Sequence, residues 1–250
     1  MIRDVRGRTF EFPQPPQRVV SLVPSITETL FDLGVGESVV GITNFCIFPS
    51  DVSLPRVGGT KNPRIEAIRT LRPDLVHMNL EENLRSHAES IEEFAPVFVS
   101  EPKDVDGTLD LLTTLGELHG CAAHAASYRT AISHQRRLLG HSAFRFACAI
   151  WKDPWMWCGG DTYVSALVSE TGGRNVLQGI TRYPQLPLEE VLELNPDVIF
   201  LPDEPYAFTT EDAAAVVGPR VVGPFPGHFF TWHGTRTLEG LKFLAEVIDR

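Results

Sequence analysis

The chain has 250 residues, of which 43% are hydrophobic and 22% charged, so it is long enough and apolar enough to fold around a sizeable core. Its 22 Lys and Arg residues face 32 Asp and Glu residues, and the net charge of -10 argues against nucleic acids and anionic lipids as partners. No apolar run approaches the roughly 20 residues of a membrane span, so membrane insertion is not expected. The first residues lack the apolar core of a signal peptide, which favours a cytoplasmic protein or a chain trimmed at its start.

Apolar runs and helical segments alternate along the first half of the chain. Four short runs have the composition of buried strands, and they lie at 18–23, 39–43, 74–78 and 96–100. Helical periodicity predicts helices at 25–33, 64–71 and 84–94. Ser25 and Glu28 have the spacing of a capping box at the start of the first helix. This alternation predicts an α/β fold with parallel sheets covered by helices on both faces.

The middle of the chain has no predicted strand. A leucine stripe predicts a helix from about Val105, which Gly116 and Gly120 are expected to break, and a second helix follows at 121–139. Strands and helices alternate again from Phe144 onward. We therefore predict an N-terminal extension (1–17), an N-terminal α/β lobe (18–118), a linker helix (119–142) and a C-terminal α/β lobe (143–250).

A short pattern occurs once in each predicted lobe. Glu66 opens a short amphipathic helix and Pro73-Asp74 follows seven residues later, and the same offset separates Glu189 from Pro196-Asp197. A helix, a Pro-Asp pair and a strand could coincide in this way by chance, but the constant offset favours an internal repeat. Two Rossmann-like lobes joined by a helix predict a ligand cleft between them.

All four tryptophans fall in segments that are predicted to be loops after strands of the second half. These are Trp151, Trp155, Trp157 and Trp232. Aromatic side chains on such loops suit a large, flat, partly apolar ligand, and the alternative is that they close the ends of the core. We expect Trp155, Trp157 and Trp232 to bind a ligand. For Trp151, the sequence does not distinguish ligand binding from packing at the end of the core.

Several motifs occur along the chain in an order that is typical of one family. They are Arg18–Glu28, Gly58-Gly59, Ile65-Glu66 with Leu71–Leu75, Gly159–Asp161, Gly172–Val176 and Tyr183-Pro184. In this order they resemble the class III substrate-binding proteins of ABC importers, the helical-backbone metal receptor group, which serves importers of cobalamin, ferric siderophores and haem. The segments Trp151–Met156 and Asp203–Phe208 are most similar to the cobalamin-binding branch.

The resemblance implies a non-enzymatic receptor whose ligand is cobalamin or another corrinoid, with no catalytic cofactor and no metal held by the protein alone. It implies ligand contacts at the loop of Phe45 and at the Trp155–Trp157 loop. With the neighbouring loops, the expected ligand-binding residues are Phe45, Lys61, Trp155, Met156, Trp157, Tyr206 and Trp232. Thr60 and Asn79 depart from the cobalamin pattern, which has tryptophans at these two positions.

The resemblance also gives the repeated glutamates a role. In this family one Glu on each lobe docks into an arginine-lined socket of the importer's membrane subunits, and Glu66 and Glu189 match these positions. Charge-assisted pairing with Arg would supply both orientation and affinity. The family implies a periplasmic or cell-surface location, whereas the start of the chain favours the cytoplasm, so the location stays open, as does an intracellular corrinoid carrier without a signal peptide.

Other functions are less well supported by the residues. The chain lacks the G-x-S-x-G, Walker, G-x-G-x-x-G and H-E-x-x-H motifs, and an enzyme would need a nucleophile such as Cys158 with His228 or His233 as its base. Those two histidines are the only ones on candidate loops, so a protein-only metal site is not favoured. A ferric siderophore or haem is the alternative ligand, but the loops offer mainly Lys61 and Lys152 as cations, with Arg182 and Arg236 nearby.

The four cysteines form no C-x-x-C pair, which argues against zinc-ribbon and thioredoxin-like sites. They are Cys46, Cys121, Cys148 and Cys158. Buried free thiols are the simplest expectation, and a disulfide stays open.

Overall fold

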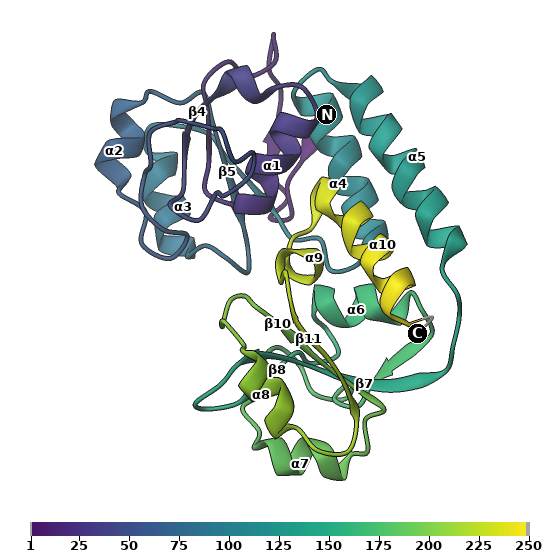
Figure 1. Ribbon diagram of the computed structural model, residues 1–250. Coiled ribbons are helices and arrows are strands. Elements are labelled where there is room, and N and C mark those ends of the chain that lie inside the picture. Colours follow the sequence, from purple (N-terminus) through teal and green to yellow (C-terminus); the bar gives the residue numbers. More distant parts are fainter. Residues whose placement is uncertain (1, 249–250) are drawn as a thin grey trace. The chain divides into compact units, whose positions relative to one another are not determined.

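The structure, a computed structural model, describes residues 2–248, and these group into two compact units (Figure 1). Unit 1 comprises the residues up to Pro102 together with Gly107–Thr130, and unit 2 comprises Lys103–Asp106 together with the residues from Ala131 onward. The division falls within the helices α4 (Val105–Leu118) and α5 (Ala122–Leu138), so each helix contributes to both units. The domain limits at 118 and 142 therefore stay a prediction.

Unit 1 is built on a four-stranded parallel sheet in the order β4-β3-β5-β6. The strands are β3 (Val19–Ser21), β4 (Val39–Ile42), β5 (Leu75–Asn79) and β6 (Val97–Ser100). Successive side chains of a strand point to opposite faces. Val19 and Leu75 accordingly pack into one core and their neighbours Val20 and Val76 into another. The expected α/β class with parallel sheets is thus confirmed.

Helices cover both faces of this sheet. α1 (Pro24–Asp32) packs with α4 and α5 on one face, and α2 (Ile65–Thr70) packs with α3 (Arg85–Glu92) on the other. The capping box predicted at Ser25 is wrong, because the N-cap of α1 is Val23 and no side chain caps it. Pro24 fixes the backbone at the first helical position and leaves Ser25 buried inside the helix.

Gly116 does not break α4 as predicted. The helix continues to Leu118 and ends before Gly120, whose positive φ of 69° closes the turn into α5. A Cβ atom at Gly116 would lie 2.6 Å from the Cβ of Ala125 and 3.2 Å from the Cα of Ala122. The missing side chain of Gly116 therefore allows α4 and α5 to pack closely.

The residues that we expected to form an N-terminal extension fold onto unit 1. β1 (Ile2–Arg3) and β2 (Thr9–Phe10) form an antiparallel pair, and Phe10 belongs to the core around Val19 and Leu75. The amide of Val5 donates to the carbonyl of Val99, at 3.1 Å, so this hairpin covers the free edge of β6.

Unit 2 contains a second sheet in the order β11-β10-β7-β8, with β9 also paired to β7. Its strands are β7 (Phe144–Trp151), β8 (Met156–Trp157), β9 (Gly173–Asn175), β10 (Val198–Pro202) and β11 (Arg220–Phe225). All of these pairings are parallel except that of β7 with β8, which is antiparallel. The segment 151–157, predicted to be a loop, is therefore a hairpin that ends in a short strand.

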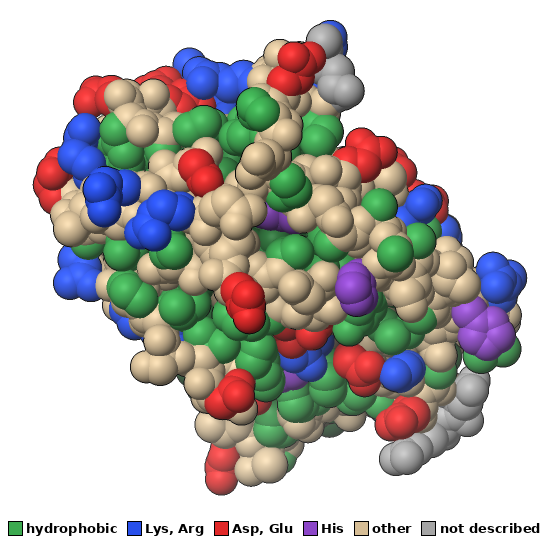
Figure 2. All heavy atoms as spheres, turned by 90° about the horizontal axis from the view of Figure 1, so that it is seen from above, with side chains coloured by type: hydrophobic (Ala, Val, Ile, Leu, Met, Phe, Trp, Pro, Cys, Tyr) green, Lys and Arg blue, Asp and Glu red, His purple; other side chains and the backbone are tan. Residues whose placement is uncertain are grey.

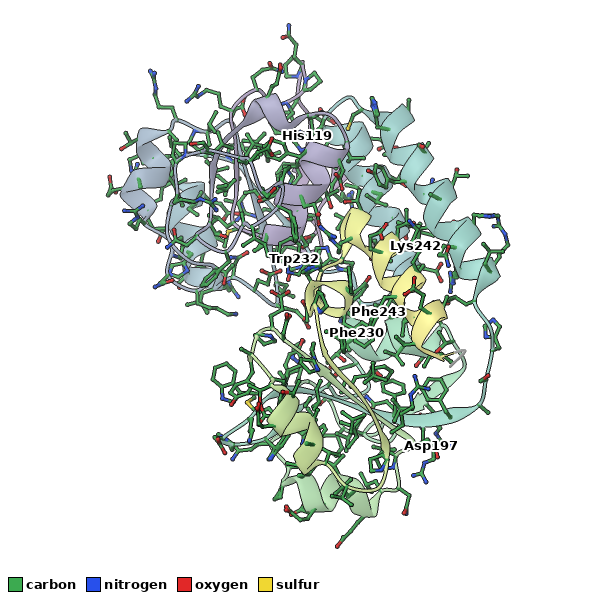
Figure 3. The ribbon with its side chains drawn as sticks, in the orientation of Figure 1. His119, Asp197, Phe230, Trp232, Lys242 and Phe243 are labelled. Atoms are coloured by element: carbon green, nitrogen blue, oxygen red, sulfur yellow. The ribbon has the colours of Figure 1, made fainter. Side chains whose placement is uncertain are left out.

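The two faces of this sheet carry different cores. On one face, Ala147, Trp157 and Ile199 pack with α7 (Leu188–Glu193) and with the segment that contains α8 (Thr210–Ala215). The other face has an aromatic core in which Phe230 and Phe243 lie next to each other (Figure 3). The helical segments that complete the unit are α6 (Tyr163–Ser169), α9 (His228–Thr231), η2 (Gly234–Arg236) and α10 (Thr237–Ile248).

Candidate functional site

The loop after β4 presents an exposed aromatic ring in unit 1. Phe45 is 59% exposed, although it lies between the buried residues Thr43 and Cys46. The guanidinium of Arg56 fixes this turn by donating to the carbonyls of Thr43, at 2.8 Å, and Cys46, at 2.7 Å. The ring of Phe45 is therefore held toward solvent on a fixed turn.

A second loop of unit 1, residues 58–63, packs against the first. The amide of Asn44 donates to the carbonyl of Gly58, at 2.8 Å, and a Cβ atom at Gly59 would lie 3.1 Å from the ring of Phe45. The exposed Lys61 donates from Nζ to the carbonyl of Glu81, at 2.6 Å. The structure therefore brings the loops of Phe45 and Lys61 together at the carboxyl end of β4.

Asn79, where the cobalamin pattern has a tryptophan, forms the turn that follows β5. It is 4% exposed, and its Oδ1 accepts from the amide of Glu81 at 2.8 Å. Asn83 continues this network, because its Nδ2 donates to the carbonyl of Thr60 at 3.0 Å. These amide side chains join the loops, so Asn79 shapes the turn and offers no aromatic surface.

The hairpin of β7 and β8 carries most of the aromatic surface of unit 2. We define the aromatic cluster as Trp151, Trp155, Trp157, Tyr206 and Phe208, which come from this hairpin and from the segment after β10. Trp155 stacks between two of them, with ring centroids 5.3 Å from Trp157 and 5.7 Å from Phe208. Trp151 meets Tyr206 edge to face at 5.4 Å. Stacking of this kind holds the rings in fixed orientations.

Members of the aromatic cluster differ in exposure: some rings are buried and support the others, which face solvent. Trp157 is fully buried and donates from Nε1 to the carbonyl of Leu186, at 2.9 Å, while Phe208 is 3% exposed. Trp151 is 42% exposed, and Trp155 and Tyr206 are half-buried, as is Met156 beside them. Trp157 is thus a core residue beneath Trp155, contrary to the expectation that all of this segment forms a loop.

Trp232 occupies a different environment from the aromatic cluster. It is 8% exposed, ends α9, and lies with its ring centroid 5.9 Å from that of His228 (Figure 3). The side chain of Glu204 accepts hydrogen bonds from Trp232 and, at 3.0 Å, from Thr231. Burial nevertheless raises the pKa of Glu204 above its usual value.

The lysine of the hairpin is already engaged. Lys152 pairs with Asp212, and the Lys152 ammonium group holds the pKa of Asp212 below its usual value. Asp212 also completes the capping box of α8 by accepting from the amide of Thr209, at 2.9 Å. The pair therefore anchors the hairpin to α8. On the face shown in Figure 2, several Lys and Arg side chains gather toward the left of the view, and acidic side chains are spread over the view.

Of the residues considered for metal binding or catalysis, His233 and Cys158 are buried and His228 is half-buried. Burial lowers the pKa of His233 to about 4, and burial with the charge of Arg236 lowers the pKa of His228. Cys158, the hypothetical nucleophile, has no exposed surface. Among residues 2–248, no three His, Cys, Asp or Glu side chains gather closely enough to hold a metal ion.

The two copies of the repeated pattern adopt the same local structure. α2 and α7 each lead to a residue with positive φ, Arg72 at 48° and Asn195 at 51°, before the Pro-Asp pair. Asp74 accepts from the amide of Arg18 at 2.9 Å, and Asp197 accepts from the amide of Arg145 at 2.7 Å. In both units the aspartate thus joins the helix to the start of a neighbouring strand.

The repeated glutamates lie in the first turns of these helices and face solvent. The side chain of Glu66 is 83% exposed and makes a 3.4 Å ion pair with Arg69, and Glu189 is also exposed. Both carboxylates are therefore accessible to a partner.

None of the helices within residues 2–248 combines the length and the apolar character needed to cross a membrane.

Comparisons with known proteins identify the same family of binding proteins from several relatives. Residues 19–218 match the family described as "Periplasmic binding protein". The uncharacterized ABC transporter substrate-binding lipoprotein YvrC of Bacillus subtilis is 25% identical over 99% of this chain and 84% of its own length. A cobalamin-binding protein of Halobacterium salinarum is 28% identical over 78% of this chain and 56% of its own length.

Solved structures share the fold at lower identity. The periplasmic vitamin B12-binding protein BtuF of Vibrio cholerae superposes with a TM-score of 0.80 at 22% identity, covering 95% of this chain and 98% of its own. The periplasmic haem-binding protein HutB of Vibrio cholerae superposes with a TM-score of 0.78 at 18% identity, covering 94% and 99%. The fold is therefore shared by proteins that are named for different ligands.

Proposed function

Because the chain belongs to the periplasmic binding protein family, we propose that it is a receptor for cobalamin or another corrinoid. The family consists of non-enzymatic substrate-binding proteins, so the expectation of a binding protein rather than an enzyme is confirmed. The relatives are of the vitamin B12, haem and siderophore type. The identity of the ligand as a corrinoid is the more specific part of this proposal, and it rests on the aromatic cluster.

The exposed part of the aromatic cluster is the observation that carries this proposal. Trp151, Trp155 and Tyr206 offer ring faces and edges to solvent above the buried rings of Trp157 and Phe208. A corrin is large, flat and partly apolar, and aromatic rings in fixed positions suit such a surface at low entropic cost. Phe45 is a further exposed ring, on unit 1.

The charges of these loops favour a corrinoid over an anionic chelate. The charge of Lys152 is offset by its ion pair with Asp212, whereas Lys61 is bonded to a neutral carbonyl and keeps its charge. Asp203, which follows β10 and precedes Tyr206 of the aromatic cluster by three residues, is exposed and adds negative charge there. The carboxamides of a corrin are neutral and tolerate this charge, whereas the carboxylates of haem or an anionic siderophore are repelled.

Substitution of Trp155 tests this function. We expect Trp155→Ala to raise the Kd for cyanocobalamin about tenfold or more, because a central aromatic contact contributes over ~1 kcal/mol. Calorimetric titration measures the Kd, and circular dichroism shows that the variant is folded. Val217→Ala is the control, since Val217 is 78% exposed and lies outside the aromatic cluster. An unchanged Kd in a folded Trp155→Ala variant contradicts the proposal.

We further propose that Glu66 and Glu189 dock the receptor to the membrane subunits of an ABC importer. Their exposure and their equivalent positions in the two units support this role. We expect the double variant Glu66→Ala/Glu189→Ala to retain its corrinoid Kd but to lose stimulation of ATP hydrolysis by a vitamin B12 importer in proteoliposomes. The neighbouring exposed residue Glu190 supplies the control, Glu190→Ala. Full stimulation by the double variant argues against docking through these residues.

A further inference from the structure

Two cysteines lie directly opposite each other in the β7–β8 hairpin. The antiparallel register pairs Ala149 with Trp157, so the next pair toward the start of β7 is Cys148 with Cys158. The amide of Cys158 donates to the carbonyl of Cys148, at 2.8 Å, which continues the ladder to this pair. Residues that face each other in an antiparallel ladder point their side chains to the same face of the sheet.

The two thiols are neighbours, and both are fully buried. The thiol of Cys148 donates to the carbonyl of Ala149, at 3.8 Å, and interacts with the thiol of Cys158, and both residues have no exposed surface. The bond from the amide of Cys158 to the carbonyl of Cys148 makes this a hydrogen-bonded pair, whose Cα atoms lie about 5.5 Å apart, within the range of about 4.4–6.8 Å that a disulfide spans. We propose that Cys148 and Cys158 form a cross-strand disulfide when the chain folds in the presence of a low-molecular-weight disulfide.

The reaction is a two-step thiol–disulfide exchange. The thiolate of one cysteine attacks a sulfur of the small disulfide, whose S–S bond breaks, and one small thiol leaves with a proton. The second cysteine, as its thiolate, then attacks the protein sulfur of this mixed disulfide and releases the second small thiol. The protein loses two electrons and two protons, and the small disulfide gains both.

The burial of the pair sets the time at which the reaction occurs. Burial raises the pKa of the Cys148 thiol well above its usual value, so the folded protein holds little of the reactive thiolate. An oxidant in solution also has no access to a sulfur without exposed surface. The disulfide therefore forms while the hairpin folds. A pair that is still reduced when the sheet is complete resists oxidation, because both sulfurs are then buried.

The other two cysteines serve as internal controls. The sulfur of Cys46 is hydrogen-bonded to the hydroxyls of Thr27 and Thr43, at 3.2 Å each, and the thiol of Cys121 donates to the carbonyl of Leu115, at 4.0 Å. Both are buried in the core of unit 1. We expect both to stay as thiols under conditions that oxidise the pair in the hairpin.

The experiment refolds the full chain from urea with a mixture of oxidised and reduced glutathione, and in parallel with dithiothreitol. Each sample is then denatured, alkylated with N-ethylmaleimide and mapped by peptide mass spectrometry. We expect the glutathione sample to link Cys148 to Cys158 and to carry adducts at Cys46 and Cys121, and the dithiothreitol sample to carry four adducts. The double variant Cys46→Ser/Cys121→Ser is expected to keep the link.

A second arm separates formation during folding from oxidation afterwards. Folded, reduced protein is incubated with the same glutathione mixture, and we expect all four thiols to remain alkylatable. The linked form is expected to unfold at a higher urea concentration than the reduced form. The proposal is overturned if the protein refolded with glutathione carries four adducts, or if it links any other pair of cysteines. Neither result depends on a corrinoid, so the proposal stands apart from the proposed function.

Discussion

Asp4 shows at the scale of a single residue how a segment predicted as an extension becomes part of the fold. Its side chain has no exposed surface, and the carboxylate accepts from the amides of Arg6 and Arg8, at 2.9 and 3.0 Å. It also accepts from Nε of Arg6, at 2.8 Å, and from the amide of Val99, at 3.3 Å. One side chain thus joins the N-terminal hairpin to the edge strand β6.

Removal of this carboxylate is expected to destabilise unit 1. Asp4→Ala leaves several buried donors without an acceptor, and we expect the free energy of unfolding to fall by about 3 kcal/mol. Asp4→Asn retains one acceptor oxygen and is expected to lose less. Urea denaturation measures both, with Asp51→Ala as the exposed control. A loss in Asp4→Ala no greater than that of the control shows that the hairpin is not held by Asp4.

Element packing places a buried histidine pair between β5 and the end of α4. The Nε2 atoms of His77 and His119 lie 2.9 Å apart, and the residues are 1% and 4% exposed. Burial lowers the pKa of His119 to about 4 and that of His77 well below its usual value. The pair is therefore neutral at pH 7, one ring donating to the other (Figure 3 labels His119).

Stability is expected to fall as the pH drops below about 6.5, where histidines of the unfolded chain begin to bind protons that the folded chain excludes. With a folded pKa of about 4, His119 and His233 each cost about 2 kcal/mol by pH 5, and the loss is absent above pH 7. Urea denaturation at pH 7.5, 6 and 5 measures the slope. His119→Gln, which can still bond to His77, is expected to reduce it, whereas the exposed His124→Gln is not. Equal slopes in all three proteins contradict this account.

The elements of the fold were largely predictable, because hydrophobic periodicity reports which faces are buried. The short strand β8 was missed because Asp153 and Pro154 give a turn signal and two residues carry no periodicity of their own. The interruption expected at Gly116 failed for a different reason. A glycine in a helical pattern marks a break or a close packing site, and only the position of Ala125 distinguishes the two.

The grouping of aromatic side chains was predictable from the sequence, but their exposure was not. Trp151, Trp155 and Trp157 stand close together in the sequence, yet their exposure runs from 42% to zero. That difference depends on Leu186 and Phe208, which lie far away along the chain and cover Trp157 and Trp155. The separate environment of Trp232 depends in the same way on Glu204. Loop composition therefore indicates a contact surface without identifying its exposed rings.

At the scale of the whole molecule, the chain is two units built on the same local plan. Each has a parallel sheet, a short helix opened by an exposed glutamate, and an aspartate that joins this helix to a strand, Asp74 in unit 1 and Asp197 in unit 2. The exposed aromatic side chains of the two units nevertheless differ. Unit 2 carries the aromatic cluster, whereas among the described residues of unit 1 the exposed phenylalanine is Phe45, which packs beside Gly59. We therefore expect unit 2 to dominate ligand affinity.

The central claim is that the ligand is a corrinoid, and a calorimetric titration of the full chain tests it most directly. Cyanocobalamin and cobinamide are titrated into the purified protein, with haemin and a ferric siderophore in parallel. The account predicts one-to-one binding of both corrinoids, with haemin and an anionic siderophore at least tenfold weaker because the exposed Asp203 repels their negative charge. Tighter binding of haemin or the siderophore, or no binding of either corrinoid, contradicts it.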